Sequence, residues 1–137
     1  MRKQATENLK IVFDKEDRVL VAYLFGSYAI GSQTSRSDVD VAILLSEIPE
    51  KMLEYHLHLV DELSQISGNN VDLIILNRAP PVLRHRVVKH GKLIYCRNEK
   101  SRIEFEARTE DEYLDFSRAI ARYDECLMRQ ILRLKEA

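Results

Sequence analysis

The feature that most constrains this chain is a pair of short apolar runs joined by a polar stretch of small residues. The first run covers residues 19–25 and stops at Gly26 and Ser27, and the second covers residues 39–45. Apolar runs of this length, bounded by turn-forming residues, are typical of buried β-strands. The sequence therefore predicts two strands connected by a polar loop.

Two acidic residues open the second run. Asp38 and Asp40 are separated by a single residue, so on a strand their side chains project from the same face. Two adjacent carboxylates repel each other unless a cation lies between them. Mg²⁺ suits an oxygen-only site that also accepts substrate phosphates. We therefore expect a magnesium site at the start of this strand.

The end of the first run supplies a second group of candidate residues. Gly26 allows a tight turn and a close approach of the backbone to a ligand. Backbone N–H groups at the start of a helical turn, here expected over residues 28–31, suit a phosphate together with the Ser27 hydroxyl. Arg36, in the connecting loop, could also reach a phosphate, although an arginine in such a loop is more often only solvated.

A third carboxylate lies in a later apolar run over residues 71–76. Asp72 is the only charged residue of this run. An isolated carboxylate in an apolar central strand is costly unless it meets a cation or hydrogen-bond donors. We therefore expect Asp72 to face the same site as Asp38 and Asp40, and the alternative is an aspartate near solvent at the start of a strand.

The spacing of these residues resembles a known family pattern. A Gly-Ser pair, ten residues, and then Asp-x-Asp is similar to the signature of the DNA polymerase β-like nucleotidyltransferases, with Gly26, Ser27, Asp38 and Asp40 at matching positions. The resemblance covers about residues 15–97. The alternative, without a functional site, is a strand connection whose aspartates only form turns.

This resemblance implies a fold, cofactors and a role for the third carboxylate. The fold would be α/β, a small mixed β-sheet with flanking helices and a C-terminal helical tail. The resemblance implies two Mg²⁺ ions as cofactors and ATP as a substrate. It also implies a carboxylate that acts as a general base and metal ligand, and Asp72 is the matching candidate.

The length narrows the resemblance further. At 137 residues the chain forms one domain, without room for the domains with which polymerases grip a template. It resembles the minimal nucleotidyltransferases, antitoxins that pair with HEPN-type RNase toxins and transfer AMP from ATP to a toxin tyrosine. Two alternatives stay open: a small-molecule, aminoglycoside-type nucleotidyltransferase, and a non-catalytic antitoxin that acts by binding alone.

Composition argues against several other classes of protein, although it leaves room for a local basic patch. The net charge is −1 and the sequence pI is about 6.4, which argues against generic nucleic-acid binding. The two cysteines form neither a metal-binding spacing nor a disulfide framework, so we expect a reducing cytoplasm. The polar start does not resemble a signal peptide, and no apolar run reaches the length of a membrane span.

The remaining elements are expected to be mostly helical. Helices are predicted over residues 3–15, 49–67 and 82–89, with a fourth strand over 93–95 at a sheet edge. The helix over 49–67 is expected to face the core through Leu53, Leu57, Val60, Leu63 and Ile66. The helix over 82–89 and the residue after it bring a basic cluster that could hold a leaving pyrophosphate but is more often a solvated face: Arg84, His85, Arg86, Lys89 and His90.

The last part of the chain is predicted to be a helical extension of the catalytic domain, with residues 1–97 in the domain and 98–137 in the extension. Two helices are expected, over about 100–107 and 109–134, the second capped by Thr109. The second carries a heptad-like apolar stripe with a further stripe beside it. It could pack on its own sheet, form a homodimer or bind a protein partner. The two stripes are Tyr113, Phe116, Ile120, Tyr123, Leu127, Ile131 and Leu134, and then Leu114, Ala121, Met128 and Leu132.

Overall fold

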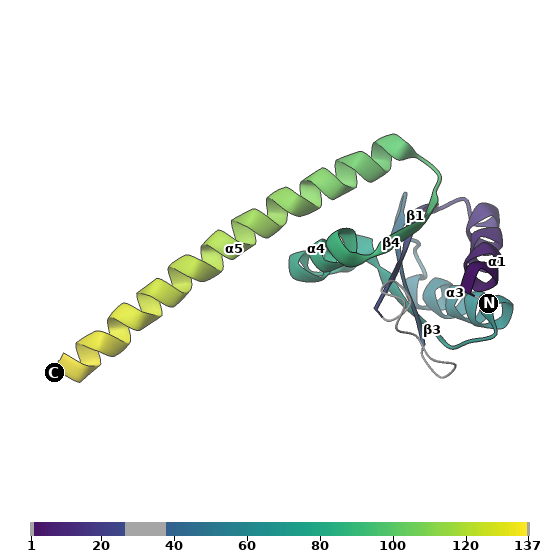
Figure 1. Cartoon of the computed structure of the whole chain (residues 1–137). Helices are drawn as coiled ribbons and strands as arrows, with labels where there is room; N and C mark the ends of the chain where they lie inside the picture. Colours follow the sequence, from purple (N-terminus) through teal and green to yellow (C-terminus); the bar gives the residue numbers. More distant parts are fainter. Residues whose placement is uncertain (1, 27–37, 137) are drawn as a thin grey trace.

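The computed structural model describes residues 2–26 and 38–136. Figure 1 shows a small sheet flanked by helices and one long helix that extends well beyond them. The predicted α/β fold with a mixed sheet is confirmed. In chain order the elements are α1 Arg2–Lys15, β1 Val19–Phe25, β2 Val39–Leu45, α3 Met52–Ser67, β3 Val71–Ile75, the 3₁₀ turn η1 Leu76–Arg78, α4 Pro81–His90, β4 Lys92–Cys96 and α5 Glu99–Glu136.

The four strands lie in the order β3-β2-β1-β4, so β3 and β4 form the two edges. Strand β1 runs antiparallel to both β2 and β4, whereas β2 and β3 are parallel. The register places Phe25 opposite Asp40, and Asp40 opposite Asp72. The end of β1 and the starts of β2 and β3 therefore meet at one end of the sheet.

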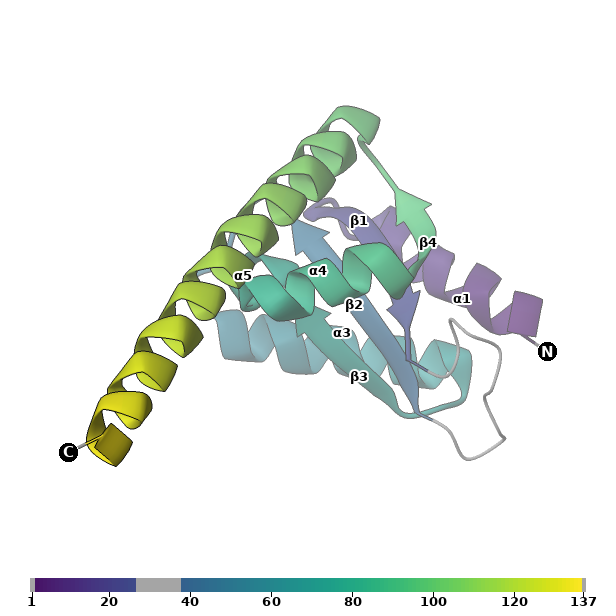
Figure 2. The same ribbon diagram turned by 60° about the vertical axis from the view of Figure 1, so that its left-hand side comes forward.

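Helices cover both faces of the sheet. Helices α1 and α3 pack on one face, and α4 with the first part of α5 packs on the other (Figure 2). Successive residues of β2 point to alternate faces. Val39, Val41 and Ile43 contact the first layer, and Ala42 and Leu44 contact the second. Because β2 is buried on both sides, its sequence is a continuous apolar run rather than an alternating one.

Local signals account for most helix ends. Helix α3 ends at Gly68, which has a φ of 74° and donates its N–H to the carbonyl of Ser64, as glycine at a helix C-terminus commonly does. Helix α4 begins at Pro81, whose missing N–H is not needed at that position. Helix α5 begins after Asn98, whose Oδ1 accepts a hydrogen bond from the Ser101 N–H at 3.0 Å.

Helix α3 differs from its prediction in its start and in its buried face. It begins at Met52 rather than at Pro49. Leu53 and Leu57, expected in the core, are 71% and 58% exposed. Val60, Leu63 and Ile66 pack against the core, as predicted, and the same inward face includes Met52, Tyr55 and Leu59.

The C-terminal region is one helix of 38 residues instead of the two predicted. Thr109 lies inside α5 and is 2% exposed, so it is not a cap. The acidic residues after Thr109 resemble a helix start, but nothing interrupts the helix there. No glycine or proline occurs from residue 99 onward, and Arg102 forms ion pairs with Glu99 and Glu106 at 2.6 and 3.0 Å. Among residues 2–26 and 38–136, no helix combines the length and apolarity needed to cross a membrane.

A partly buried hydrogen-bond network joins the first part of α5 to the sheet. Phe105 is 4% exposed and packs with residues of β1 and β2. Beside it, the Tyr23 hydroxyl donates to Oε1 of Glu106 at 2.8 Å, and Arg102 donates to the other oxygen of that carboxylate. Burial, followed by the interaction with Glu106, raises the pKa of Tyr23 far above its usual value. The phenol therefore stays protonated and acts as a donor.

Replacement of this tyrosine should weaken the attachment of α5. Tyr23→Phe removes a hydrogen bond to a charged acceptor, which should lower the free energy of unfolding by about 1–2 kcal/mol. Tyr123→Phe is a matched control, because Tyr123 is 66% exposed on the same helix. Urea unfolding of the two variants measures the difference, and equal stabilities would contradict the structural role of the Tyr23 hydroxyl.

Candidate functional site

The three predicted aspartates lie near the starts of β2 and β3. The parallel register sets Asp40 directly opposite Asp72. Asp38 precedes Asp40 by two residues, so it projects from the same face of β2. This is the face on which α4 and α5 pack further along the strands, since Ala42 lies in that layer. The structure thus brings Asp40 and Asp72 together and places Asp38, which is exposed, at the outer margin.

The electrostatics of Asp40 reflect this grouping. Burial is the largest cause of a raised pKa for its carboxyl group. The negative charge of Asp72, a hydrogen bond with Asp72 and the charge of Asp38 raise the pKa further. Like charges at close range disfavour ionisation in this way. The site therefore concentrates negative charge that a bound cation would relieve.

Asp72 reaches the site for a different reason from the one predicted. It was expected in a central strand, where burial would require a cation. Strand β3 is instead an edge strand, and Asp72 is exposed, so the argument from burial is wrong. The pairing of β3 with β2 places Asp72 beside Asp40. The edge position leaves its carboxylate accessible to a large molecule.

Gly26 lies against this carboxylate group. Its φ is 70°, a left-handed conformation that other residues adopt at a cost. A Cβ at this position would clash with Oδ2 of Asp40. The backbone conformation therefore favours glycine here, and a larger residue would have to displace the carboxylate. The structure places Gly26 beside Asp40, and its predicted role in letting the backbone approach a ligand stays a prediction. Ser27, Arg36 and the turn over 28–31 lie outside the described residues.

The donor chemistry of the site fits Mg²⁺. Asp38, Asp40 and Asp72 offer only carboxylate oxygens, the ligands that this ion prefers, and Gly26 leaves room beside one of them. Within residues 2–26 and 38–136, no three His, Cys, Asp or Glu side chains are already arranged to hold a metal. The assignment of these aspartates as metal ligands therefore stays a prediction, supported by the chemistry of the residues.

The basic cluster of α4 divides into two groups. Arg84 and His85 point toward α5, where they pair with Glu112 at 2.7 Å and Glu110 at 3.2 Å. Arg86, Lys89 and His90 are exposed, and the last two lie at the C-terminal end of α4. Lys92 begins β4 opposite Leu24 of β1, which packs in the α1 and α3 layer, so it lies on the face of the sheet opposite the aspartates.

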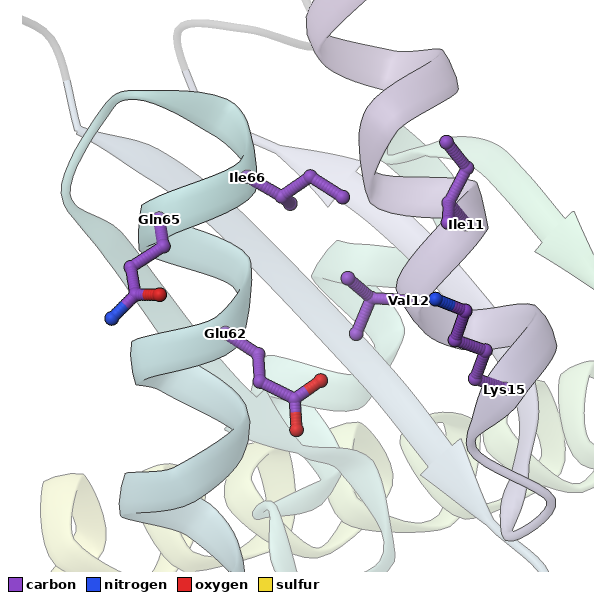
Figure 3. A pocket seen from close by; sticks show the side chains of 6 residues that line it. All are labelled: Ile11, Val12, Lys15, Glu62, Gln65 and Ile66. Atoms are coloured by element: carbon purple, nitrogen blue, oxygen red, sulfur yellow. The ribbon is translucent and has the colours of Figure 1, made fainter.

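A shallow hollow between α1 and α3 is separate from this site. Figure 3 shows Lys15 and Glu62 on its opposite sides. It lies on the α1 and α3 face of the sheet, whereas the aspartates are on the other face. We assign it no role in binding. Its lining residues are Ile11, Val12, Lys15, Glu62, Gln65 and Ile66.

The raised pKa of Asp40 predicts how the stability of the metal-free protein depends on pH. A carboxyl group whose pKa is higher in the folded than in the unfolded chain stabilises the fold most below the unfolded value, about 4. This contribution is lost as pH rises through the folded pKa. Asp40→Asn should therefore raise the melting temperature by a few degrees at pH 7 and have little effect below about pH 4. Thermal unfolding at both pH values, with Asp61→Asn on α3 as control, checks this; a lower melting temperature at pH 7 would contradict it.

Two glycines with the same backbone conformation provide a matched test of the space beside Asp40. Gly26 and Gly68 have φ values of 70° and 74°, but a Cβ on Gly68 would meet nothing within 4 Å. Alanine should cost each position about 1 kcal/mol in strain, and only Gly26→Ala should also displace the carboxylate. Mg²⁺ titration by calorimetry should show weaker binding for Gly26→Ala alone. Equal affinities in the two variants would exclude the proposed contact.

Two comparisons with solved structures place the fold. The chain aligns with a crystal structure of a toxin-antitoxin with AMP-PNP at a TM-score of 0.75 and 24% identity, covering 90% of this chain and 98% of that one. A structure of a tri-AMPylated Shewanella oneidensis HEPN toxin in complex with MNT antitoxin aligns at a TM-score of 0.72 and 22% identity, covering 93% and 99%. At these identities the two structures establish a shared fold.

Sequence comparison adds the family. The chain is 33% identical over 95 residues to the protein adenylyltransferase MntA of Shewanella oneidensis, an alignment that covers 68% of this chain and 67% of that protein. Residues 7–100 match the family model described as Polymerase beta, Nucleotidyltransferase. They include Gly26 and all three aspartates. Because this match covers more than half of the chain, the protein belongs to the polymerase β nucleotidyltransferase family.

Proposed function

We propose that this protein is a Mg²⁺-dependent adenylyltransferase that transfers AMP from ATP to a tyrosine of a HEPN-family toxin and so acts as its antitoxin. The observation that carries this proposal is the register that sets Asp40 beside Asp72, with Gly26 against Asp40. The relative MntA, which is named a protein adenylyltransferase, supports the choice of a protein acceptor.

The proposal assigns the carboxylates to the metal and the turn at Gly26 to the phosphates. Asp38, Asp40 and Asp72 would hold Mg²⁺, with two ions expected from the family resemblance. When bound, Mg²⁺ neutralises charge on the triphosphate and lowers the pKa of the attacking hydroxyl. Asp40 is the least exposed of the three and lies against Gly26, so it would anchor the site. The backbone at Gly26 and the hydroxyl of Ser27 would hold the β- and γ-phosphates.

The transfer itself is a displacement at phosphorus. The tyrosine oxygen forms a bond to the α-phosphorus of ATP, the bond from that phosphorus to the bridging oxygen of the β-phosphate breaks, and pyrophosphate leaves. The phenolic proton passes to Asp72, which is exposed on an edge strand where an acceptor can approach. Catalysis of this kind depends mainly on positioning and on neutralising charge.

The exposure of two carboxylates favours a protein acceptor over a small molecule. Asp38 and Asp72 are both exposed, so the described part of the site does not enclose an acceptor as a small-molecule transferase would.

The close grouping of carboxylates around Asp40 disfavours an antitoxin that acts by binding alone, because without a cation these charges repel each other. The requirement for ATP and the thiols of Cys96 and Cys126, both free, fit a reducing cytoplasm.

Substitution of the carboxylates tests the proposal. With α-labelled ATP, Mg²⁺ and a HEPN-family toxin as the acceptor, label should appear on that protein. Asp38→Asn or Asp40→Asn should lower transfer by about 10²-fold or more without unfolding the chain, and Asp72→Asn should lower turnover while ATP still binds. Ser27→Ala should mainly raise the KM for ATP, since its proposed contact is with the phosphates.

Asp61→Asn provides the control, because Asp61 is an exposed carboxylate on α3. Full transfer by Asp40→Asn would refute the metal assignment. Label on an aminoglycoside but not on the HEPN-family protein would favour the small-molecule alternative. Suppression of the toxin without any labelled product would favour the non-catalytic one.

A further inference from the structure

The outer part of α5 presents a long apolar face that the rest of the described chain leaves uncovered. Every residue from 118 to 135 is exposed, and in Figures 1 and 2 this part of the helix extends away from the other elements. We call residues 116–135 the distal segment. Its main apolar stripe comprises Phe116, Ile120, Tyr123, Leu127, Ile131 and Leu134, which are 39–77% exposed.

This stripe continues an interface that already exists within the chain. Phe105 and Thr109 are buried against the domain. They precede Phe116 by about three and two turns of helix, so they lie on the same side of α5. The face that packs on the sheet and on α4 therefore runs on, without a change of side, into the distal segment. A partner bound to the distal segment would therefore extend the apolar core that α5 forms with its own domain.

A second apolar line indicates the shape of the occupant. Leu114, Met128 and Leu132 are 43–55% exposed and lie about 120–160° around the helix from Phe116. One packing surface covers a stripe of roughly 100°. Both lines can be buried together only in a groove formed by two elements. Anchors at spacings of three and four residues are typical of a helix that binds in a helical groove.

Charge distinguishes a second copy of this chain from a different partner. The distal segment carries five basic residues and two acidic ones, so pairing with itself would bring two basic segments together. Earlier in α5, Glu110 and Glu112 already pair with His85 and Arg84, whereas Asp111 and Asp115 are exposed and lie before the distal segment. Within the distal segment itself basic residues outnumber acidic ones, which favours an acidic partner over a second copy aligned along the same segment.

We propose that the distal segment of α5 is the docking surface for the acceptor, which presents an acidic, two-helix apolar groove. This inference rests on the proposed function, since it takes the acceptor to be the HEPN-family toxin. The C-terminal end of α5 lies away from the start of β2 in both views. Docking and chemistry are therefore separate: the distal segment holds the acceptor, and the aspartates act on its tyrosine.

Truncation of two central anchors tests the surface. Tyr123→Ala with Leu127→Ala in the full chain should weaken binding of a HEPN-family toxin by at least about tenfold, since aromatic anchors carry much of the energy of an interface. Calorimetry without ATP measures the affinity. The KM for that protein should rise, while ATP affinity and turnover at saturating acceptor stay unchanged. Ile103→Ala is the matched control, because Ile103 is 57% exposed on the same helix but outside the distal segment.

A charge reversal tests the nature of the partner. Arg129→Glu with Arg133→Glu should weaken the same interaction and reduce its dependence on salt, because both arginines are exposed on the distal segment. Lys100→Glu, at the start of α5, provides the matched control. Binding that is unaffected by either double variant would overturn the docking surface.

The remaining outcomes separate this inference from the proposed function. A wild-type dimer in sedimentation that dissociates in Tyr123→Ala with Leu127→Ala, with toxin binding unchanged, would make a second copy the occupant and overturn the proposal. Toxin binding that depends on the distal segment without any transfer of label would support the docking surface and refute the proposed chemistry. Transfer of label that is insensitive to both double variants would support the proposed chemistry and overturn the docking surface.

Discussion

The pairing of β2 with both of its neighbours is the constraint on which the rest of the structure depends. Its antiparallel pairing with β1 brings Phe25, and hence Gly26, opposite Asp40, and its parallel pairing with β3 brings Asp72 to the other side. A shift of one residue in either register would turn Asp40 or Asp72 to the opposite face. The apolar residues of β2, buried in both layers, fix that register because slippage would expose them.

The same pairing creates an electrostatic conflict that the core has to outweigh. Asp40 is partly buried beside Asp72 and near Asp38, and each of these factors disfavours its charge. Gly26 adds a left-handed backbone conformation at the same point. Local rules are usually violated in this way where a site needs a ligand. The violations are concentrated at the end of the sheet, away from the packing of Phe105 and Tyr23 that secures α5.

How much of this could be predicted depends on the range of the interactions involved. The strands and the positions of Asp38 and Asp40 follow from two-residue periodicity and from turn residues, which are local signals. The edge position of β3 is a matter of strand order, which no local pattern contains, and so the argument from burial of Asp72 failed. On α3 both Leu59 and the pair Leu53 and Leu57 could face inward, and only contact with α1 and the sheet selects Leu59. The metal and phosphate roles remain predictions.

The dimensions of α5 connect the chemistry with the size of its substrate. A helix rises about 1.5 Å per residue, so the distal segment is about 30 Å long. Because α5 has no glycine or proline, and Tyr23 and Phe105 hold its first turns against the sheet, its direction is fixed relative to the aspartates. An acceptor that contacts both the distal segment and Asp72 must itself extend from one to the other. If the helix is a docking element, the acceptor is therefore a folded macromolecule, and the open edge beside Asp72 is the opening that such an acceptor requires.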